Sequence, residues 1–335
     1  MNCPVYASGF ASSLIENRLR EFGKLSEINL KLMTENSKIK LENFSIEFIT
    51  TTHSIPEPYS ILITTNYGKL LHTADWKIDP NPLIGSNFNF KSFRNLADEN
   101  LLALIGDSTN ADIPGSSKSE LDVRNELVNV FARYNNRIIT TCFSSNIARI
   151  ESIALAAKKN NRKVALVGRS MKKTIESAIE NNFGKNLSNF INEDEISMIP
   201  RENIVIICTG SQGEKRSALY RIAYNSHKNI RLEGGDLVIF SSRDIPGNEK
   251  LINNLKNLLI SQKVEIISSD DDLVHVSGHG YADEIKNMYD WTRPYISIPV
   301  HGEYKHLVAH SKLAQSAQVP FTKILENGKC LKIAP

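Results

Sequence analysis

Five histidine and aspartate residues directly follow short apolar runs and could act together in chemistry. They are His53, Asp75, Asp107, His279 and His301. Strand ends in α/β folds are rigid and open to solvent, so binding and catalytic side chains gather there. Neutral imidazole nitrogens and carboxylate oxygens are the ligands of hydrolytic zinc centres, with bonds of about 2.0–2.1 Å. These residue types therefore indicate metal-assisted hydrolysis, with three of the five as candidate ligands.

Each of these residues also has an ordinary structural interpretation. A single histidine at a strand end is more often a hydrogen-bonded structural group than a ligand. Asp75 could equally cap a loop, because aspartate is favoured in turns. Only the set of five, taken together, favours a chemical site.

Two further stretches suit phosphate binding. Residues 275–279 combine two imidazoles, a hydroxyl and an unhindered glycine amide in His275, Val276, Ser277, Gly278 and His279. If 273–277 is a strand, its period of two places His275, Ser277 and His279 on one side, where they could hold a phosphate. Ser144, Ser145 and Asn146 lie between a strand and a helix. They are good helix N-caps, and a cap leaves other donors free for phosphate.

Three strand-end turns give weaker signals. Residues 209–214 contain two glycines and precede a helix, so their amides could hold an anion, although such a stretch is more often a simple strand-to-helix turn. Residues 168–170 and 241–243 each carry an arginine, Arg169 and Arg243. Either arginine could contact an RNA backbone or only solvate a loop.

The elements that must position these residues alternate between β-branched apolar runs and helical patterns. The expected strands lie near 44–52, 60–65, 69–74, 101–106, 137–142, 163–168, 203–209, 236–242, 263–267, 273–277 and 295–300. The expected helices lie near 11–22, 120–134, 146–159, 171–182, 214–224, 248–260, 281–291 and 304–316. This alternation predicts an α/β fold. The regular spacing from about 120 to 270 predicts a parallel sheet, inserted as a unit at 114–271.

Composition restricts the class of protein without naming a function. With 335 residues, 41% hydrophobic and 23% charged, the chain has the balance of a globular protein. A net charge of +3 means that a nucleic acid would have to bind a local basic surface. The four cysteines form no CxxC pair, which favours a reducing cytoplasm over a disulfide framework. No apolar run approaches the roughly 20 residues of a membrane span, and the start does not read as a signal peptide.

The motifs, in this order, resemble the ribonuclease J family, which has a metallo-β-lactamase fold with a β-CASP insertion. The resemblance covers essentially the whole chain and is carried by segments 4–7, 52–56, 107–111, 145–149, 168–171, 208–214, 245–249, 275–280 and 299–304. It implies a partial metallo-β-lactamase αββα sandwich with an inserted β-CASP α/β domain. Residues 1–113 would form the first part of the sandwich, 114–271 the β-CASP domain, and 272–335 the returning part.

The resemblance also implies roles for the candidate residues. His53 would bind one of two zinc ions, Asp75 would bridge both, and His301 would bind the second. Asp107 and His279 resemble the acid/base pair of the family. The 144–146 and 275–279 segments correspond to a pocket that grips nucleotide phosphate, including the 5′-monophosphate of single-stranded RNA. The implied activity is 5′-to-3′ exoribonuclease with some endoribonuclease activity, in which a metal-bound hydroxide hydrolyses the phosphodiester.

One departure from the family is serious. The family's His-x-His-x-Asp-His metal motif is absent from these 335 residues and would lie upstream of Pro4. We therefore interpret the sequence as an N-terminally truncated fragment, expected to be inactive alone and a homo-oligomer when full-length. A non-catalytic RNA-binding or assembly subunit is the main alternative, which the five intact residues disfavour. A small-molecule hydrolase of the same fold is a third, which the large insertion disfavours.

Overall fold

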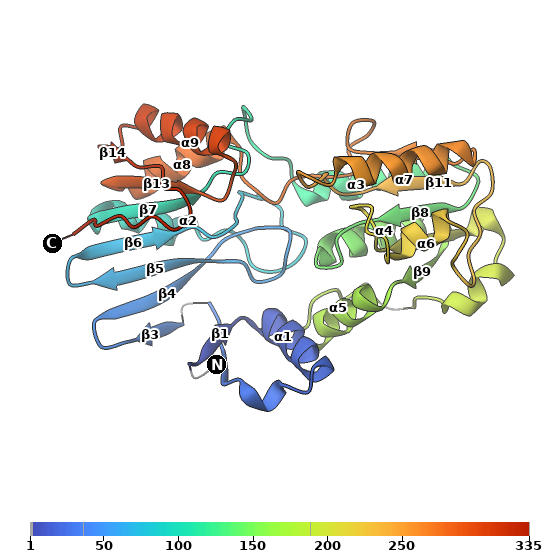
Figure 1. Ribbon diagram of the computed structural model, residues 1–335, viewed down its shortest axis with the longest axis horizontal. Helices are drawn as coiled ribbons and strands as arrows, with labels where there is room; N and C mark the ends of the chain where they lie inside the picture. The colour runs from blue at the N-terminus through green and yellow to red at the C-terminus, as the bar shows by residue number, and fades with distance from the viewer. Residues whose placement is uncertain (1–2, 36, 188, 335) are drawn as a thin grey trace.

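The computed structural model describes residues 3–35, 37–187 and 189–334. Two large sheets lie side by side, each with its own helices (Figure 1). The α/β class expected from the sequence is confirmed. The domain boundaries at 113 and 271 stay a prediction.

The first large sheet has seven strands, which come from both ends of the sequence. Its order is β14 (Phe321–Thr322), β13 (Ile296–Val300), β7 (Leu101–Asp107), β6 (Gly68–His72), β5 (Tyr59–Thr65), β4 (Phe44–Thr50) and β3 (Lys38–Lys40). Strands β3 to β6 pair antiparallel, whereas β6, β7, β13 and β14 pair parallel. Because β4 and β6 both run antiparallel to β5, the carboxyl ends of β4, β6, β7 and β13 lie at one edge.

Three helices cover one face of this sheet: α2 (Phe90–Asn95), α8 (Ala282–Thr292) and α9 (Tyr304–Ser316). Phe93, Met288 and Ala314 pack with Leu71 and Leu104 of the sheet in one apolar cluster. The opposite face carries apolar side chains of β4 and β5 that stay partly exposed. The described residues therefore supply one sheet and one helical layer of the expected sandwich.

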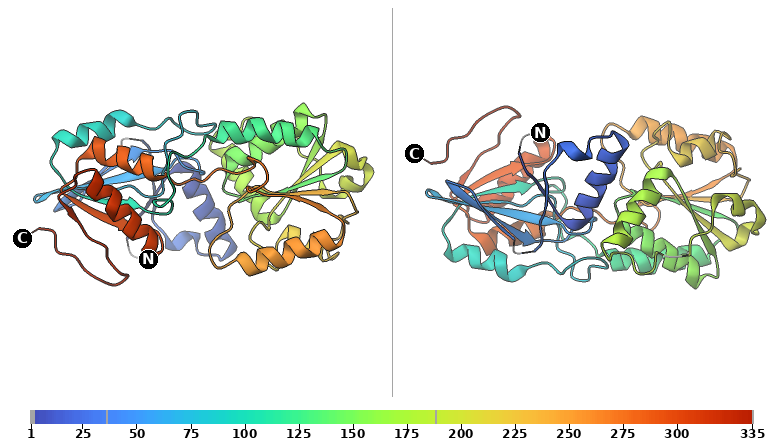
Figure 2. Two further views of the ribbon diagram at one scale, coloured as in Figure 1. Left: turned by 90° about the horizontal axis from the view of Figure 1, so that it is seen from above. Right: turned by 90° about the horizontal axis from the view of Figure 1, so that it is seen from below.

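The second large sheet is parallel throughout, as the regular spacing predicted. Its order is β12 (Glu265–Ile267), β11 (Leu237–Phe240), β8 (Ile138–Thr141), β10 (Ile204–Cys208) and β9 (Lys163–Val167). Helices α3 (Glu120–Ala132), α4 (Ile147–Lys159) and α5 (Arg169–Glu180) share one core cluster, and α6 (Ala218–Ala223) and α7 (Glu249–Ser261) share another. Figure 2 shows the sheet between these two layers. Burial on both faces explains why its strands are continuous apolar runs.

The N-terminal segment packs against the second sheet's helices. Strands β1 (Val5–Ala7) and β2 (Leu30–Leu32) form a separate parallel pair, with α1 (Gly9–Glu21) between them. The Asn17 side chain donates to Ser177 Oγ at 2.9 Å, and that of Asn181 donates to Ser13 Oγ at 2.8 Å. Helix α1 therefore lies beside α5 (Figure 2). Short 3-10 turns occupy Leu25–Glu27, Leu96–Asp98, Glu193–Met198 and Arg201–Asn203.

Two expected elements are wrong. The described residues 273–277 form no strand, because the Val274 carbonyl accepts hydrogen bonds from Arg149 and from the Ser241 hydroxyl in place of a neighbouring strand. The helix expected to start at 214 starts at Ala218, since Gly210 and Gly213 adopt positive φ and Ser217 caps the helix.

Within the described residues no helix is both long and apolar enough to cross a membrane. Cys142 and Cys208 are buried free thiols, and Cys3 and Cys330 are exposed and free.

Candidate active site

Four of the five candidate residues lie at the shared carboxyl edge of the seven-stranded sheet. His53 follows β4, Asp75 follows β6, Asp107 ends β7 and His301 follows β13. His279 arrives from the loop between β12 and α8. The fold therefore brings together all five residues that the sequence singled out.

Asp75 lies between two imidazoles. Its Oδ2 atom is 3.9 Å from His53 Nε2, and its Oδ1 atom is 3.2 Å from His301 Nε2. Possible ligand atoms of His53, Asp75 and His279 all lie within 4.8 Å of one another, and so do those of Asp107, His279 and His301. A mixed set of imidazoles and carboxylates at this spacing fits a divalent metal such as zinc. His279 belongs to both groups, although the sequence suggested no metal contact for it.

The backbone beside these ligands is held in an unusual conformation. Ala74 has φ 52° and His301 has φ 57°, both in the left-handed region that non-glycine residues seldom adopt. The Ala74 amide donates to His72 Nδ1 at 3.0 Å, which helps to hold the turn before Asp75. Strain of this kind persists only where surrounding contacts enforce it, and it concentrates at functional sites.

The ring of His53 is fixed by the loop that carries His279. His53 Nδ1 lies 2.5 Å from the Gly278 carbonyl, which can only accept a hydrogen bond, so Nδ1 carries the proton. Nε2 is then unprotonated, faces Asp75 and can bind a metal through its lone pair. A Cβ at Gly278 would lie 2.4 Å from His53 Cε1. Burial lowers the pKa of His53, against the opposing effect of the Gly278 hydrogen bond. A neutral imidazole is the form that binds metal.

Asp107 and His279 form a hydrogen-bonded pair. His279 Nδ1 donates to Asp107 Oδ2 at 2.6 Å, and Asp107 Oδ1 accepts from the Thr109 amide at 3.0 Å and hydroxyl at 2.7 Å. Burial acts to raise the pKa of Asp107, but the hydrogen bonds from His279 and Thr109 outweigh it and lower the pKa. The ionised carboxylate thus fixes the tautomer of His279 and leaves Nε2 open for proton transfer.

Asp75 and His301 shift each other's pKa in opposite directions. The hydrogen bond with His301 lowers the pKa of Asp75, and the same bond raises the pKa of His301. A metal must therefore compete with a proton for His301, so metal binding should weaken as the pH falls.

Asn146 caps α4, as its sequence position suggested. Its Oδ1 accepts from the Arg149 amide at 3.0 Å. Asn146, Ser277, His53 and Lys77 line one narrow hollow beside the candidate metal ligands. Ser144 and Ser145 are partly exposed in the same loop. Ser144 and Ser145 therefore stay accessible, whereas Asn146 is buried and its Oδ1 is used by the cap.

The expected common direction of His275, Ser277 and His279 is wrong, because no strand alternates them. His275 Nδ1 lies 3.3 Å from Arg149 Nη1, whereas Ser277 Oγ accepts from Asn110 at 2.8 Å and His279 faces Asp107. Burial, with Arg149 adding to it, lowers the pKa of His275 well below its usual value. His275 is therefore a neutral, partly buried ring, and Val276 is buried.

Arg149 is a buried residue that sequence reasoning did not place at the centre of this region. It binds both carboxylate oxygens of Glu120, at 2.5 and 2.8 Å, and donates to the carbonyls of Ser241 and Val274 at 2.9 and 3.0 Å. One side chain thus joins α3, α4, the end of β11 and the His279 loop. An arginine within the apolar pattern of α4 was the available signal.

Glu284 is a second residue that the sequence did not reveal. Its carboxylate accepts from the amides of Ile78, Ser117 and Tyr281 at 2.7, 2.7 and 2.8 Å, and from the Ser117 hydroxyl at 3.0 Å. It therefore ties the loop after Asp75 to the start of α8. Its position three residues into that helix was the available signal.

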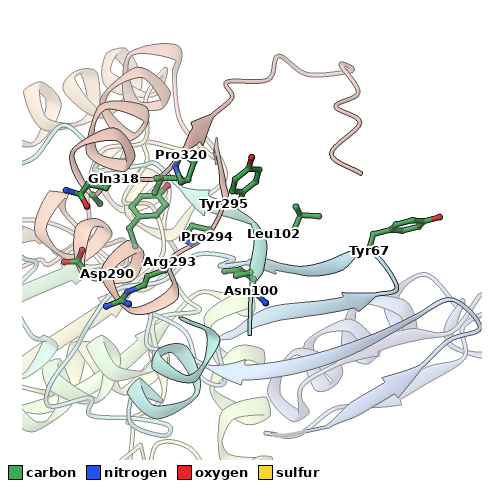
Figure 3. A pocket seen from close by; sticks show the side chains of 13 residues that line it. Tyr67, Asn100, Leu102, Asp290, Arg293, Pro294, Tyr295, Gln318 and Pro320 are labelled. Atoms are coloured by element: carbon green, nitrogen blue, oxygen red, sulfur yellow. The ribbon is translucent and has the colours of Figure 1, made fainter. Parts of the chain in front are cut away.

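A separate hollow of about 900 Å³ lies at the amino ends of β7 and β13, lined by Tyr67, Asn100, Arg293 and Tyr295 among others (Figure 3). Asp107 stands at the other end of β7, about 20 Å away at 3.3 Å per residue. None of the candidate site residues lines this hollow.

Two family models match the chain. Residues 135–259 match "Ribonuclease J, beta-CASP domain", and residues 265–321 match "Zn-dependent metallo-hydrolase RNA specificity domain". The second family implies a metal cofactor.

Several full sequences are similar along the whole chain. Ribonuclease J of Sinorhizobium meliloti is 44% identical over 336 residues, covering 100% of this chain and 59% of that protein. Ribonuclease J 1 of Streptococcus pyogenes is 39% identical, covering 99% and 60%, and ribonuclease J of Thermus thermophilus is 35% identical, covering 98% and 58%. The chain spans about three-fifths of the length of these relatives.

A crystal structure of a protein of unknown function from Enterococcus faecalis has the same fold. Its TM-score is 0.68 at 15% identity, over 98% of this chain and 75% of that one. The resemblance deduced from the motifs is confirmed by the two family models and the three relatives: the chain belongs to the ribonuclease J family.

Proposed function

We propose that this chain forms the RNA-cleaving region of a zinc-dependent ribonuclease. The observation that carries the proposal is that the Asp107–His279 pair, joined at 2.6 Å, borders an aspartate held between two imidazoles. Metal ligands and a proton-transfer pair at one strand edge are the parts that phosphodiester hydrolysis requires.

The proposed metal ligands are His53, Asp75 and His301, with Asp75 bridging two zinc ions. Their imidazole and carboxylate donors fit zinc, but three side chains cannot complete two tetrahedral sites, so other ligands must contribute. Bound zinc would polarise the phosphate and acidify the attacking water. His53 reaches the site with Nε2 free because Nδ1 donates to the Gly278 carbonyl, and burial favours the neutral ring by lowering its pKa.

Asp107 and His279 are proposed as the acid/base pair. Asp107 accepts a hydrogen bond from His279 Nδ1, so Nε2 is the nitrogen that would take up a proton and deliver it to the leaving 3′-oxygen. The Thr109 contacts keep the carboxylate ionised and fixed while this happens. Such a pair contributes typically 10²–10⁴-fold to a rate.

The substrate is proposed to be single-stranded RNA with a 5′-monophosphate. Ser144, Ser145 and Asn146 with the run His275 to His279 would hold the phosphate. The buried Lys77, whose Nζ donates to the Lys118 carbonyl at 2.8 Å and pairs with Asp79 at 3.4 Å, lines the same hollow. We further propose that the enzyme cuts RNA 5′-to-3′ from the end, with some internal cutting. We also propose that it forms homo-oligomers and acts in the cytoplasm.

The test is RNA cleavage by the protein of the complete reading frame. We expect a 5′-monophosphorylated single-stranded RNA to be cut, a chelator to abolish cutting, and zinc to restore it. Single-stranded DNA of the same sequence is the control and should be cut far more slowly. Failure of the zinc-loaded protein to cut RNA, or cutting that survives complete removal of metal, would contradict the proposal.

A further inference from the structure

A basic hollow lies at the carboxyl ends of β9 and β10, away from the candidate active site. Its volume is about 660 Å³. Six cationic side chains line it: Arg18, Arg169, Lys173, Lys215, Arg216 and Arg221. Glu21 is the single acidic residue in this lining. We call these six residues the basic cluster.

Most of the positive charge in the basic cluster is not neutralised. Glu21 pairs with Lys173 at 2.5 Å and with Arg18 at 2.8 Å. Among the residues that the structure describes, Arg169, Lys215, Arg216 and Arg221 form no ion pair, and all four are exposed. Exposed cations gathered without counter-charges raise the local concentration of an anionic ligand.

The basic cluster shares a sheet edge with Asn146 of the proposed phosphate pocket. All five strands of the second large sheet run parallel, so their carboxyl ends lie at one edge. Asn146 follows β8 at this edge, and Arg169 follows β9. Only β10 lies between those two strands, so they are about 10 Å apart at a spacing of about 4.8 Å. A strand of RNA at Asn146 needs only a few more nucleotides to reach the basic cluster.

Tyr220 of α6 and Tyr224, which follows the last residue of this helix, form an aromatic pair on either side of Arg221 in the sequence. The rings of Tyr220 and Tyr224 stack with their centroids 4.3 Å apart, and Tyr224 is 49% exposed. Arg221 belongs to the same helix. Proteins that bind single-stranded nucleic acid without base readout combine cations for the backbone with exposed rings on which bases stack. This combination favours RNA over an acidic protein as the occupant.

We propose that the basic cluster holds the backbone phosphates of the RNA strand beyond the nucleotides at the candidate active site. This inference rests on the proposed function, because it takes RNA as the ligand. The surface then acts as a length sensor: an RNA of a few nucleotides fills the active site only, and a longer one also reaches the cluster. The sequence left two roles open for Arg169, contact with an RNA backbone or solvation of its loop. This proposal assigns it the first.

The experiment measures binding of this chain, without added metal, to two 5′-monophosphorylated single-stranded RNAs. One is a trinucleotide, and the other has about twelve nucleotides, within the usual range of such binding sites. The test variant is Arg216→Ala with Arg221→Ala, which removes two exposed, unpaired cations. The matched control is Lys158→Ala with Lys159→Ala, which removes the same charge from the far end of α4, about 20 Å from Asn146.

We expect the test variant to bind the longer RNA about tenfold more weakly and the trinucleotide as wild type does. The slope of log affinity against log salt should fall by about 0.7 for each phosphate that the variant no longer binds. The control should bind both RNAs as wild type. Unchanged binding of the longer RNA by the test variant overturns the inference, and so does equal weakening by test and control. If the metal-loaded protein failed to cleave RNA, the proposed function would be contradicted. The binding result would still decide this inference, because binding is measured without metal and without cleavage.

Discussion

His279 Nδ1 lies 2.6 Å from Asp107 Oδ2, although 172 residues separate the two in sequence. The whole five-stranded sheet and its helices lie between them along the chain. The chain leaves the five-stranded sheet at β12 shortly before His279. The position of that sheet therefore determines where His279 meets the edge of the first sheet. The geometry of this pair thus depends on how the inserted unit packs.

Replacing Asp107 with Asn should remove catalysis and leave the fold intact. The amide can present its NH₂ to His279 and favour the wrong tautomer, so the ring loses its oriented proton. We expect cleavage to fall by about 10²–10⁴-fold with unchanged zinc content, measured by RNA cleavage and metal analysis on one preparation. A fall of less than about threefold would show that Asp107 does not orient the acid.

Replacing Gly278 with Ala should displace the His53 ring. The new Cβ would lie 2.4 Å from His53 Cε1 and 2.5 Å from Nδ1, so the ring must leave its position and its hydrogen bond to the Gly278 carbonyl. Zinc affinity, measured by competition with a chromogenic chelator, should fall by about 10–100-fold, the usual cost of disturbing a ligand's support. Gly234→Ala is the control, since its Cβ would come only within 3.3 Å of Lys263 Cβ. Equal zinc affinities in the two variants would refute this role.

Replacing Arg149 with Met should destabilise the protein strongly. The change leaves the buried Glu120 carboxylate without its partner, at a cost of about 3–5 kcal/mol in the free energy of unfolding. The double variant Arg149→Met with Glu120→Leu should recover part of this loss, because no unpaired charge remains. Urea denaturation measures both.

Arg133→Met provides the comparison for this buried pair. Arg133 pairs with Asp272 at the surface, with 49% of its side chain exposed, and should cost at most about 1 kcal/mol. If Arg149→Met lowered the free energy of unfolding no more than Arg133→Met does, the contacts of Arg149 would not stabilise the fold as proposed.

His310 should make stability depend on pH. It is buried between Ser108 Oγ at 2.8 Å and the Tyr289 hydroxyl at 2.7 Å, and burial lowers its pKa to about 4. Between pH about 6.5 and 4, His310 is protonated in the unfolded chain but stays neutral in the folded chain. The free energy of unfolding should therefore fall by about 3 kcal/mol between pH 6.5 and 4 on account of this group.

The comparison for His310 is His310→Gln, which cannot titrate. Its free energy of unfolding should fall less steeply over the same pH range, whatever its absolute value. Parallel pH profiles for the two proteins would show that His310 does not contribute.

Much of this arrangement follows from local sequence patterns. The strands β10 and β11 are continuous apolar runs because helices bury both faces, and such runs are visible in sequence. The five candidate residues were found because each directly follows a predicted strand. Parallel pairing then brings strand ends to one edge, so their proximity could be expected before any contact was known.

The parts that escaped prediction depend on contacts between distant segments. The direction of His275 was wrong because Arg149, 126 residues earlier, binds its ring and the neighbouring carbonyl. Arg149 and Glu284 each stood at a conspicuous helix position, but no local spacing could predict that Arg149 binds Glu120 or that Glu284 also binds Ile78 and Ser117. Strands β1, β2, β3 and β14 have two or three residues each, too few for a periodic pattern.

The most direct test of the account is the zinc content of Asp75→Asn, because Asp75 lies against both His53 and His301. Asp98→Asn, an exposed carboxylate outside the site, is the control. The account predicts that Asp75→Asn loses zinc and RNA cleavage together, whereas Asp98→Asn keeps both. Full zinc content with normal cleavage in Asp75→Asn would contradict the proposed metal centre.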